Sequence, residues 1–195
     1  MLFSGIPFLY YFLPLVILCY FLVPKSFKNT VLLVFSLVFY AWGEPVYVFL
    51  MIAVTFSDYL LGRIMARADN ISKKRGCLIV SLVIDLLALG FFKYADFLIS
   101  TVNSVFGLNL PLLELALPIG ISFFVFQSLS YTIDLYRGEV EVEKSYAHYL
   151  MYVSLFPQLI AGPIVRFQTV QYELHHRVIV KDEFFAGATR FLLGL

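Results

Sequence analysis

One segment, residues 118–138, limits what this chain can fold into more than any other. It reads PIGISFFVFQSLSYTIDLYRG and is long enough to cross a bilayer as a helix. Its polar residues recur at i, i+3, i+4 and i+7 and therefore share one helical face: Gln127, Ser130, Tyr131 and Asp134. In hydrocarbon, an amide or a carboxylate is costly unless it faces protein or a water-filled cavity. We therefore expect this segment to line an internal surface.

The composition is that of a membrane protein. The chain is 61% hydrophobic and 14% charged, whereas soluble domains are about half apolar and about a quarter charged. A net charge of +1 gives no electrostatic reason to expect a nucleic-acid partner. We predict an all-α polytopic membrane protein that forms one membrane domain over residues 1–195.

Apolar runs predict about six to seven membrane helices, some of them broken or re-entrant. A crossing helix needs about 20 apolar residues, and the candidate spans are 6–23, 30–42, 46–61, 77–99, 117–136 and 149–165, with a further run from about 183 onward. The first run lacks the flanking features of a signal peptide, so a retained helix is expected. Only Gly43-Glu44-Pro45 separates the second run from the third. This turn predicts a tight hairpin, or an incomplete crossing by one of the two.

The distribution of Lys and Arg predicts the orientation. Basic residues follow the first run at 25–28 and the third run at 63–75, whereas 100–116 contains none. The positive-inside rule then places the basic turns in the cytoplasm and both the N-terminus and residues 100–116 outside.

The run 149–165 contains residues that break helices. Pro157 and the pair Gly162-Pro163 interrupt backbone hydrogen bonding, and broken backbone at membrane depth occurs where it is buried in protein or lines a cavity. A complete crossing would also place Arg166 and Arg177 outside, against the positive-inside rule. We therefore expect a re-entrant segment that returns to the cytoplasm, with a full crossing as the alternative.

Two motifs carry a resemblance to a known family: the segment 118–138 and FPQLIAGPIVR at 156–166. Three weaker motifs agree with them in order along the chain: FYAWGEP at 39–45, DYLLG at 58–62 and FFKYADF at 91–97. Together they resemble the membrane-bound O-acyltransferase family, in particular its alginate-acetylating branch. The resemblance covers nearly the whole chain but only the N-terminal part of the family's length.

The resemblance implies a multi-pass protein of the bacterial inner membrane that takes part in acyl transfer. The donor would be acetyl-CoA or another cytoplasmic thioester, and the acceptor an extracytoplasmic polysaccharide such as alginate. Membrane lipid and secreted or membrane-anchored acetyltransferases would be the partners. The family's catalytic histidine is expected beyond Leu195, so this chain is predicted to hold no catalytic residue, to bind no cofactor and to be inactive alone.

Within such an enzyme, this chain would form one side of a funnel through the membrane. The candidate residues for lining the funnel or the donor path are Gln127, Tyr131, Asp134, Arg137, Gln158, Gly162 and Arg166. The alternative for Gln127 is an interhelical hydrogen bond, and for Asp134 and Arg137 an i, i+3 ion pair. Arg166 beside broken backbone suits an anionic donor such as a coenzyme A phosphate, or is a snorkelling side chain at a structural corner.

The histidines predict no metal site. His148 is isolated in the sequence, and His175 and His176 are adjacent, which is not the helical spacing that places two ligands on one face. Three other functions stay open beside acetyl transfer. They are D-alanyl transfer towards teichoic acid by a sister branch of the family, solute binding by a transporter with broken helices, and a non-catalytic membrane remnant.

Overall fold

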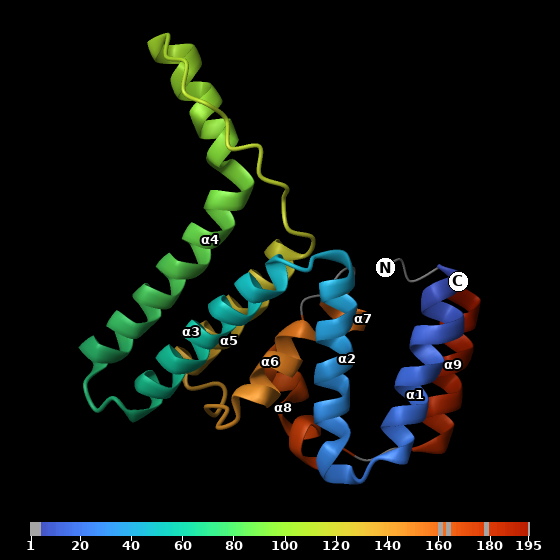
Figure 1. Ribbon diagram of the computed structural model, residues 1–195. Coiled ribbons are helices and arrows are strands. Elements are labelled where there is room, and N and C mark those ends of the chain that lie inside the picture. The colour runs from blue at the N-terminus through green and yellow to red at the C-terminus, as the bar shows by residue number, and fades with distance from the viewer. Residues whose placement is uncertain (1–4, 160–161, 163–164, 178–179, 195) are drawn as a thin grey trace.

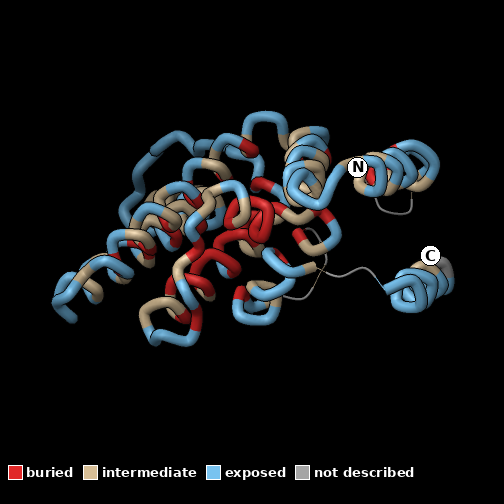
Figure 2. The backbone as a smooth tube through the Cα atoms, turned by 90° about the horizontal axis from the view of Figure 1, so that it is seen from below, coloured by how far each residue is buried: buried red, intermediate tan, exposed pale blue. Residues whose placement is uncertain are grey.

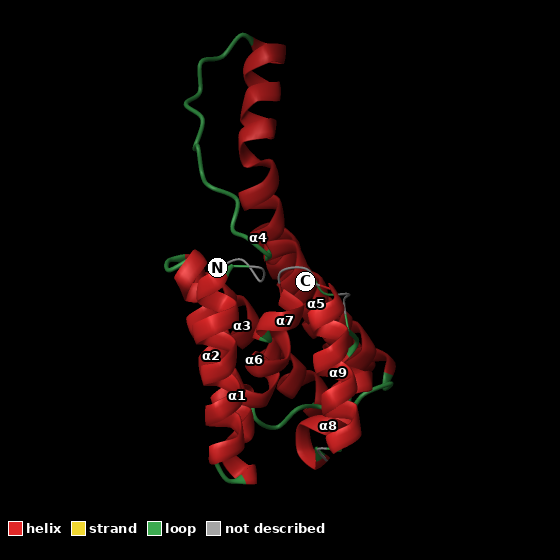
Figure 3. Cartoon of the chain, turned by 90° about the vertical axis from the view of Figure 1, so that its right-hand side faces the viewer, coloured by secondary structure: helices red, strands yellow, loops and turns green. Residues whose placement is uncertain are grey.

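The computed structural model describes residues 5–159, 162, 165–177 and 180–194. These residues form helices and loops without a strand (Figure 3), which confirms the all-α class. Pro163 and Leu195, which entered the sequence arguments, lie outside the described residues. The helices, shown in Figure 1, are η1 (Phe8–Phe12), α1 (Leu13–Leu22), η2 (Lys25–Phe27), α2 (Lys28–Gly43), α3 (Tyr47–Arg67), α4 (Ile71–Phe106), α5 (Ile121–Arg137), α6 (Tyr146–Ser154), α7 (Phe156–Leu159), α8 (Phe167–His176) and α9 (Lys181–Gly194).

Three helical segments of the described chain are long and apolar enough to cross a membrane: Lys25–Gly43, α3 and α4. Phe8–Leu22 adds a shorter apolar helix. Large apolar side chains are exposed along these helices, as expected for surfaces that face lipid. The chain is therefore a membrane protein, while the total number of crossings stays a prediction.

The turn at residues 44–46 does not produce the tight hairpin that the sequence predicted. α2 packs mainly against α6, whereas α3 packs against α4 and α5, and the axes of α2 and α3 diverge in Figure 1. Both segments reach membrane-crossing length, so neither is cut short. The reason for the divergence is that each helix buries its own face against a different partner. Short-range sequence does not encode that choice.

α5 is the centre of the packed core. It contacts α3, α4, α6 and α8, and Figure 2 shows the buried residues concentrated in this part of the fold. The rings of Tyr131 and Tyr149 lie 4.7 Å apart between α5 and α6. α3 approaches α5 closely at Gly62, where an added Cβ would lie 3.2 Å from the side chain of Leu135. This packing buries the polar face of α5 within the protein.

The predicted broken segment is indeed divided into short helices. α6 has 9 residues and α7 has 4, so α6 rises by about 14 Å, well short of the roughly 30 Å of hydrocarbon. The side-chain amide of Gln171, after the break, donates a 3.0 Å hydrogen bond to the carbonyl oxygen of Glu141, before it. The chain therefore leaves this segment at the end of the bundle where it entered, the geometry that a re-entrant segment requires, while re-entry into the membrane stays a prediction.

The turns that carry most of the basic residues lie at this same end, the lower end in Figure 1. Asn29, at the start of α2, donates a 2.8 Å hydrogen bond to the carbonyl oxygen of Leu174 in α8. Arg63, near the end of α3, donates a 2.9 Å hydrogen bond to the carbonyl oxygen of Lys144. These contacts gather α2, α3, α8 and the α5–α6 loop into one basic end.

At the opposite end, α4 extends beyond the rest of the bundle, and the loop 108–119 returns along it (Figure 1). The helix continues past the predicted boundary at residue 99 and ends at Gly107, which has a positive φ of 65°. Asn103 exchanges two 2.9 Å hydrogen bonds with the backbone of Leu110. Asp96 accepts a 2.7 Å hydrogen bond from the N–H of Leu113. Polar side chains of α4 therefore fix the path of an otherwise apolar loop.

Candidate functional site

The polar face of α5 points into the protein. Gln127, Tyr131 and Asp134 are all buried. The amide of Gln127 donates a 2.8 Å hydrogen bond to the carbonyl oxygen of Tyr152. The interhelical alternative for Gln127 is therefore the one that the structure shows.

Asp134 and Arg137 do not form the predicted ion pair. Asp134 is 2% exposed, and its Oδ2 has no hydrogen-bond partner among the described residues. The side chain of Arg137 is 58% exposed and lies 3.8 Å from Glu139. The pair fails because α5 ends at Arg137 and Gly138 turns the chain with a positive φ of 76°, which places Glu139 beside the arginine.

Arg166 is also beside Glu139, at 3.9 Å from its second carboxylate oxygen, and its side chain is 59% exposed. Glu139 thus lies between Arg137 and Arg166 and offsets the positive charge of both. An anion would meet a weaker positive field here than two uncompensated arginines would produce.

Gln158 and Gly162 lie together at the break after α7. The N–H of Gly162 donates a 3.0 Å hydrogen bond to the carbonyl oxygen of Gln158. The side-chain Nε2 of Gln158 is buried and has no hydrogen-bond partner within the described part of the chain. The structure therefore brings together Gln158 with Gly162, and Arg137 with Arg166, but no hydrogen bond or ion pair between described residues joins Gln127 to either group.

A cavity of about 510 Å³ opens between the α5–α6 loop and α8 at the basic end. None of the predicted lining residues borders it. Three carboxylates do, those of Glu139, Glu141 and Glu143, and they outnumber the single lysine, Lys144. This lining favours a cation and disfavours the anionic phosphates of a coenzyme A donor.

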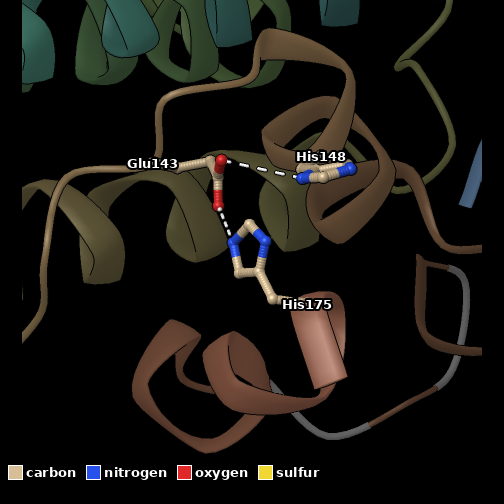
Figure 4. Close-up of side chains that lie close together, drawn as sticks. All are labelled: Glu143, His148 and His175. Carbon is tan, nitrogen blue, oxygen red and sulfur yellow. Dashed lines mark hydrogen bonds and ion pairs between the residues drawn. The ribbon is translucent and has the colours of Figure 1, made fainter. Parts of the chain in front are cut away.

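Glu143, His148 and His175 meet at the edge of this cavity (Figure 4). Glu143 comes from the α5–α6 loop, His148 from the first turn of α6 and His175 from the last turn of α8. One carboxylate oxygen of Glu143 lies 3.0 Å from Nε2 of His175, and the other lies 3.7 Å from Nδ1 of His148. The carboxylate thus lies between two imidazole rings that flank the broken segment.

Two hydrogen bonds hold Glu143, one through its backbone N–H and one through its carboxylate. The hydroxyl of Tyr131 accepts a 3.1 Å hydrogen bond from the N–H of Glu143. The N–H of Ser145, at the start of α6, donates a 2.9 Å hydrogen bond to Oε1 of the same glutamate. Tyr131 on the central helix therefore positions the loop residue that faces the histidines.

A second buried polar group joins α3, α4 and α5. The hydroxyl of Ser81 donates a 2.6 Å hydrogen bond to Oδ1 of Asp58 and lies 3.3 Å from the hydroxyl of Thr132. All three residues are fully buried. These contacts hold the three helices together inside the bundle.

Comparison with known proteins shows where this chain belongs. It is 40% identical over 199 residues to the probable alginate O-acetylase AlgI of Azotobacter vinelandii and 39% identical to that of Pseudomonas aeruginosa, in both cases along the whole chain. It is 31% identical, over 85% of its length, to the peptidoglycan O-acetyltransferase of Helicobacter pylori. The chain belongs to the membrane-bound O-acyltransferase family. It spans about 40% of the length of the Azotobacter acetylase and 38% of the Pseudomonas one.

No family model matches the chain, and no solved structure is similar to it. The assignment to the O-acyltransferases therefore depends on the named relatives, and the residues of the site are assigned from the structure of this chain.

Sequence reasoning missed the meeting of Glu143, His148 and His175. It treated His175 as half of a pair with His176, whereas the structure pairs it with Glu143. One signal for this cluster was available. If the segment between them is re-entrant, residues 138–148 and residues 167–177 lie on the same side of the membrane. Under that prediction, their Glu and His residues could have been considered together.

Proposed function

We propose that this chain is part of a membrane O-acetyltransferase that passes an acetyl group from a cytoplasmic donor to a polysaccharide outside the cell. The observation that carries this proposal is the 40% identity, along the whole chain, to a probable alginate O-acetylase. The short helices α6 and α7 agree with such a role. Irregular backbone at membrane depth is tolerated where it is enclosed by protein or lines a cavity.

The proposed orientation places the basic end of the bundle in the cytoplasm of a bacterium. The N-terminus and the loop 108–119 then lie outside, and the segment that contains α6 and α7 dips into the membrane from the cytoplasmic side. Its entry and exit at one end, joined by Gln171 and Glu141, support this arrangement.

Of the residues that the sequence predicted to line the acyl path, Asp134 and Gln158 are the ones that the structure supports best. Each carries a buried polar atom without a hydrogen-bond partner among the described residues, and such atoms are costly unless a ligand or water satisfies them. Gln127 is already hydrogen-bonded to Tyr152, and Tyr131 to Glu143. These two residues serve instead to hold the helices that form the path.

The proposed donor is acetyl-CoA or another cytoplasmic thioester, and the proposed partners are membrane lipid and secreted or membrane-anchored acetyltransferases. A histidine general base, which the family resemblance implies, would activate the acceptor hydroxyl. We assign that role to none of the three histidines of this chain.

Deletion of the gene that encodes this chain tests the proposal. The O-acetyl content of the exopolysaccharide is expected to fall and to recover on complementation, while the D-alanine esters of the cell envelope stay unchanged. Loss of acetyl groups from peptidoglycan alone would reassign the acceptor. Unchanged acetylation of both polymers would refute the proposal.

A further inference from the structure

Glu143 is a buried carboxylate that faces histidines and no stronger cation. Its side chain is 2% exposed, and its ion-pair partners in the described part of the chain are His148 and His175 alone. Burying an ionised carboxylate without compensation costs several kcal/mol. The hydrogen bond from the Ser145 N–H offsets part of this cost, and a cation bound beside the carboxylate would offset more.

His148 is not satisfied by the glutamate alone. Its Nδ1 is buried and has no hydrogen-bond partner among the residues described, although it lies 3.7 Å from Oε1 of Glu143. That atom points towards the carboxylate at a separation too long for a hydrogen bond. An ion placed between the two groups would satisfy both.

We propose that Glu143, His148 and His175 bind a divalent transition-metal ion, with Zn²⁺ the best match. One ligand atom from each residue lies within 4.8 Å of the other two. Ligand atoms around a tetrahedral Zn²⁺ with bonds of about 2.0–2.1 Å lie about 3.4 Å apart. Glu143 lies 3.7 Å from His148 through Oε1 and 3.0 Å from His175 through Oε2. Both separations are near this value, and the carboxylate would bind through one or both oxygens. The side chain of His175 is 42% exposed and therefore has room to adjust its position around an ion.

The ligand set and its surroundings agree with this ion. Two imidazoles and one carboxylate are a known zinc set that leaves the fourth position open. Glu143 and His175 border the 510 Å³ cavity, so that position is within reach of water or an oxygen-bearing ligand. Glu141, a further glutamate of the lining, adds negative charge that attracts a cation.

Such an ion would join the two ends of the broken segment. His148 begins α6, before the break, and His175 ends α8, after it. Metal binding therefore clamps the base of the segment that dips into the membrane. This role is separate from acetyl transfer and can be tested without measuring it.

The test is a Co²⁺ titration of the purified gene product, carrying a Strep tag and stripped of metal with EDTA in detergent. Visible d–d absorption is expected to rise with Co²⁺ and to be displaced by Zn²⁺. Loss of an outer-shell partner weakens metal binding by roughly 10–100-fold. A substitution that removes a ligand itself should weaken Co²⁺ binding by more than this factor. We expect this result for three variants: Glu143→Gln, His148→Gln and His175→Gln.

His176→Gln is the matched control because His176 is the next residue, stacks on Tyr172 and lies outside the cluster. It should bind Co²⁺ like the unmodified protein. Equal loss in His176→Gln and His175→Gln, or no spectral change in the unmodified protein, would overturn the proposal.

A second pair of variants covers the case in which the glutamine variants fold poorly. His175→Cys replaces one zinc ligand by another and is expected to give an intense thiolate-to-cobalt charge-transfer band. His176→Cys should lack that band. If both variants or neither show the band, His175 is not a ligand and the site is a hydrogen-bonded ion pair only.

Discussion

The side-chain amide of Gln127 donates a hydrogen bond of 2.8 Å to the carbonyl oxygen of Tyr152. Tyr152 lies in the last turn of α6, which ends at Ser154. Carbonyls in the last turn of a helix lack intrahelical partners, and hydrocarbon offers no water to replace them. One buried amide of α5 therefore stabilises the point at which α6 ends and the helix is interrupted.

Replacement of this amide should destabilise the protein. Gln127→Leu leaves the Tyr152 carbonyl buried without its donor, and such a loss costs about 1–3 kcal/mol. A lower midpoint of thermal unfolding in detergent, followed by circular dichroism, is the expected result. Gln168→Leu at an exposed site of α8 is the control. Equal midpoints for the two variants would show that the hydrogen bond contributes nothing measurable.

Gly162→Ala should be destabilising for a different reason. A Cβ at this position would lie 2.7 Å from the Cα of Gln158 and 2.9 Å from its carbonyl oxygen, so the backbone would have to move. Overpacking of this kind costs about 1–3 kcal/mol. Gly187→Ala, in α9, meets no atom within 4 Å and should raise stability by about 0.5–1 kcal/mol. Thermal unfolding of both variants checks that the two stability changes have opposite signs. A Gly162→Ala protein as stable as the unmodified one would contradict the close approach of Gly162 to the backbone of Gln158.

Tyr131→Phe should weaken the placement of Glu143 while keeping the core packed. The change removes the hydroxyl that accepts the 3.1 Å hydrogen bond from the Glu143 N–H but keeps the ring contacts with Tyr149 and Phe167. Unfolding free energy should fall by about 1–3 kcal/mol, and Co²⁺ should bind less tightly. Tyr172→Phe, at a 71% exposed position, should change neither quantity. If Tyr131→Phe leaves Co²⁺ affinity intact, the tyrosine does not position the loop.

Cysteine labelling in spheroplasts tests the proposed orientation. Cys19 and Cys77 are free and would first be replaced by serine. An impermeant maleimide should label Asn109→Cys in the return loop directly, and should label Gln168→Cys in α8 only after the membrane is permeabilised. External labelling of Gln168→Cys would mean that the segment between α5 and α8 crosses completely.

The parts of the fold that the sequence predicted are those set by local chemistry. Apolar runs predicted helices near the observed positions, and Pro157 predicted an interruption near the end of α6, because these effects act within one or two turns. The i, i+3, i+4, i+7 pattern of α5 likewise predicted a buried polar face.

The parts that it missed depend on contacts between distant segments. Asp134 and Arg137 have the spacing of an ion pair, but the turn at Gly138 gives Arg137 a different partner. Glu143 and His175 are 32 residues apart. They meet only because the intervening chain doubles back, and no spacing rule along one helix describes such a pair.

The length of α4 has a consequence for how the protein is handled. Its 36 residues would measure about 54 Å at 1.5 Å per residue, against roughly 30 Å of hydrocarbon. The overhang and its return loop nevertheless carry exposed apolar side chains, among them Phe97, Phe106 and Leu110. Water does not solvate such a surface well, so lipid or further protein must cover the protruding end of α4 and the loop 108–119. Harsh delipidation would therefore make this part of the molecule the first to aggregate.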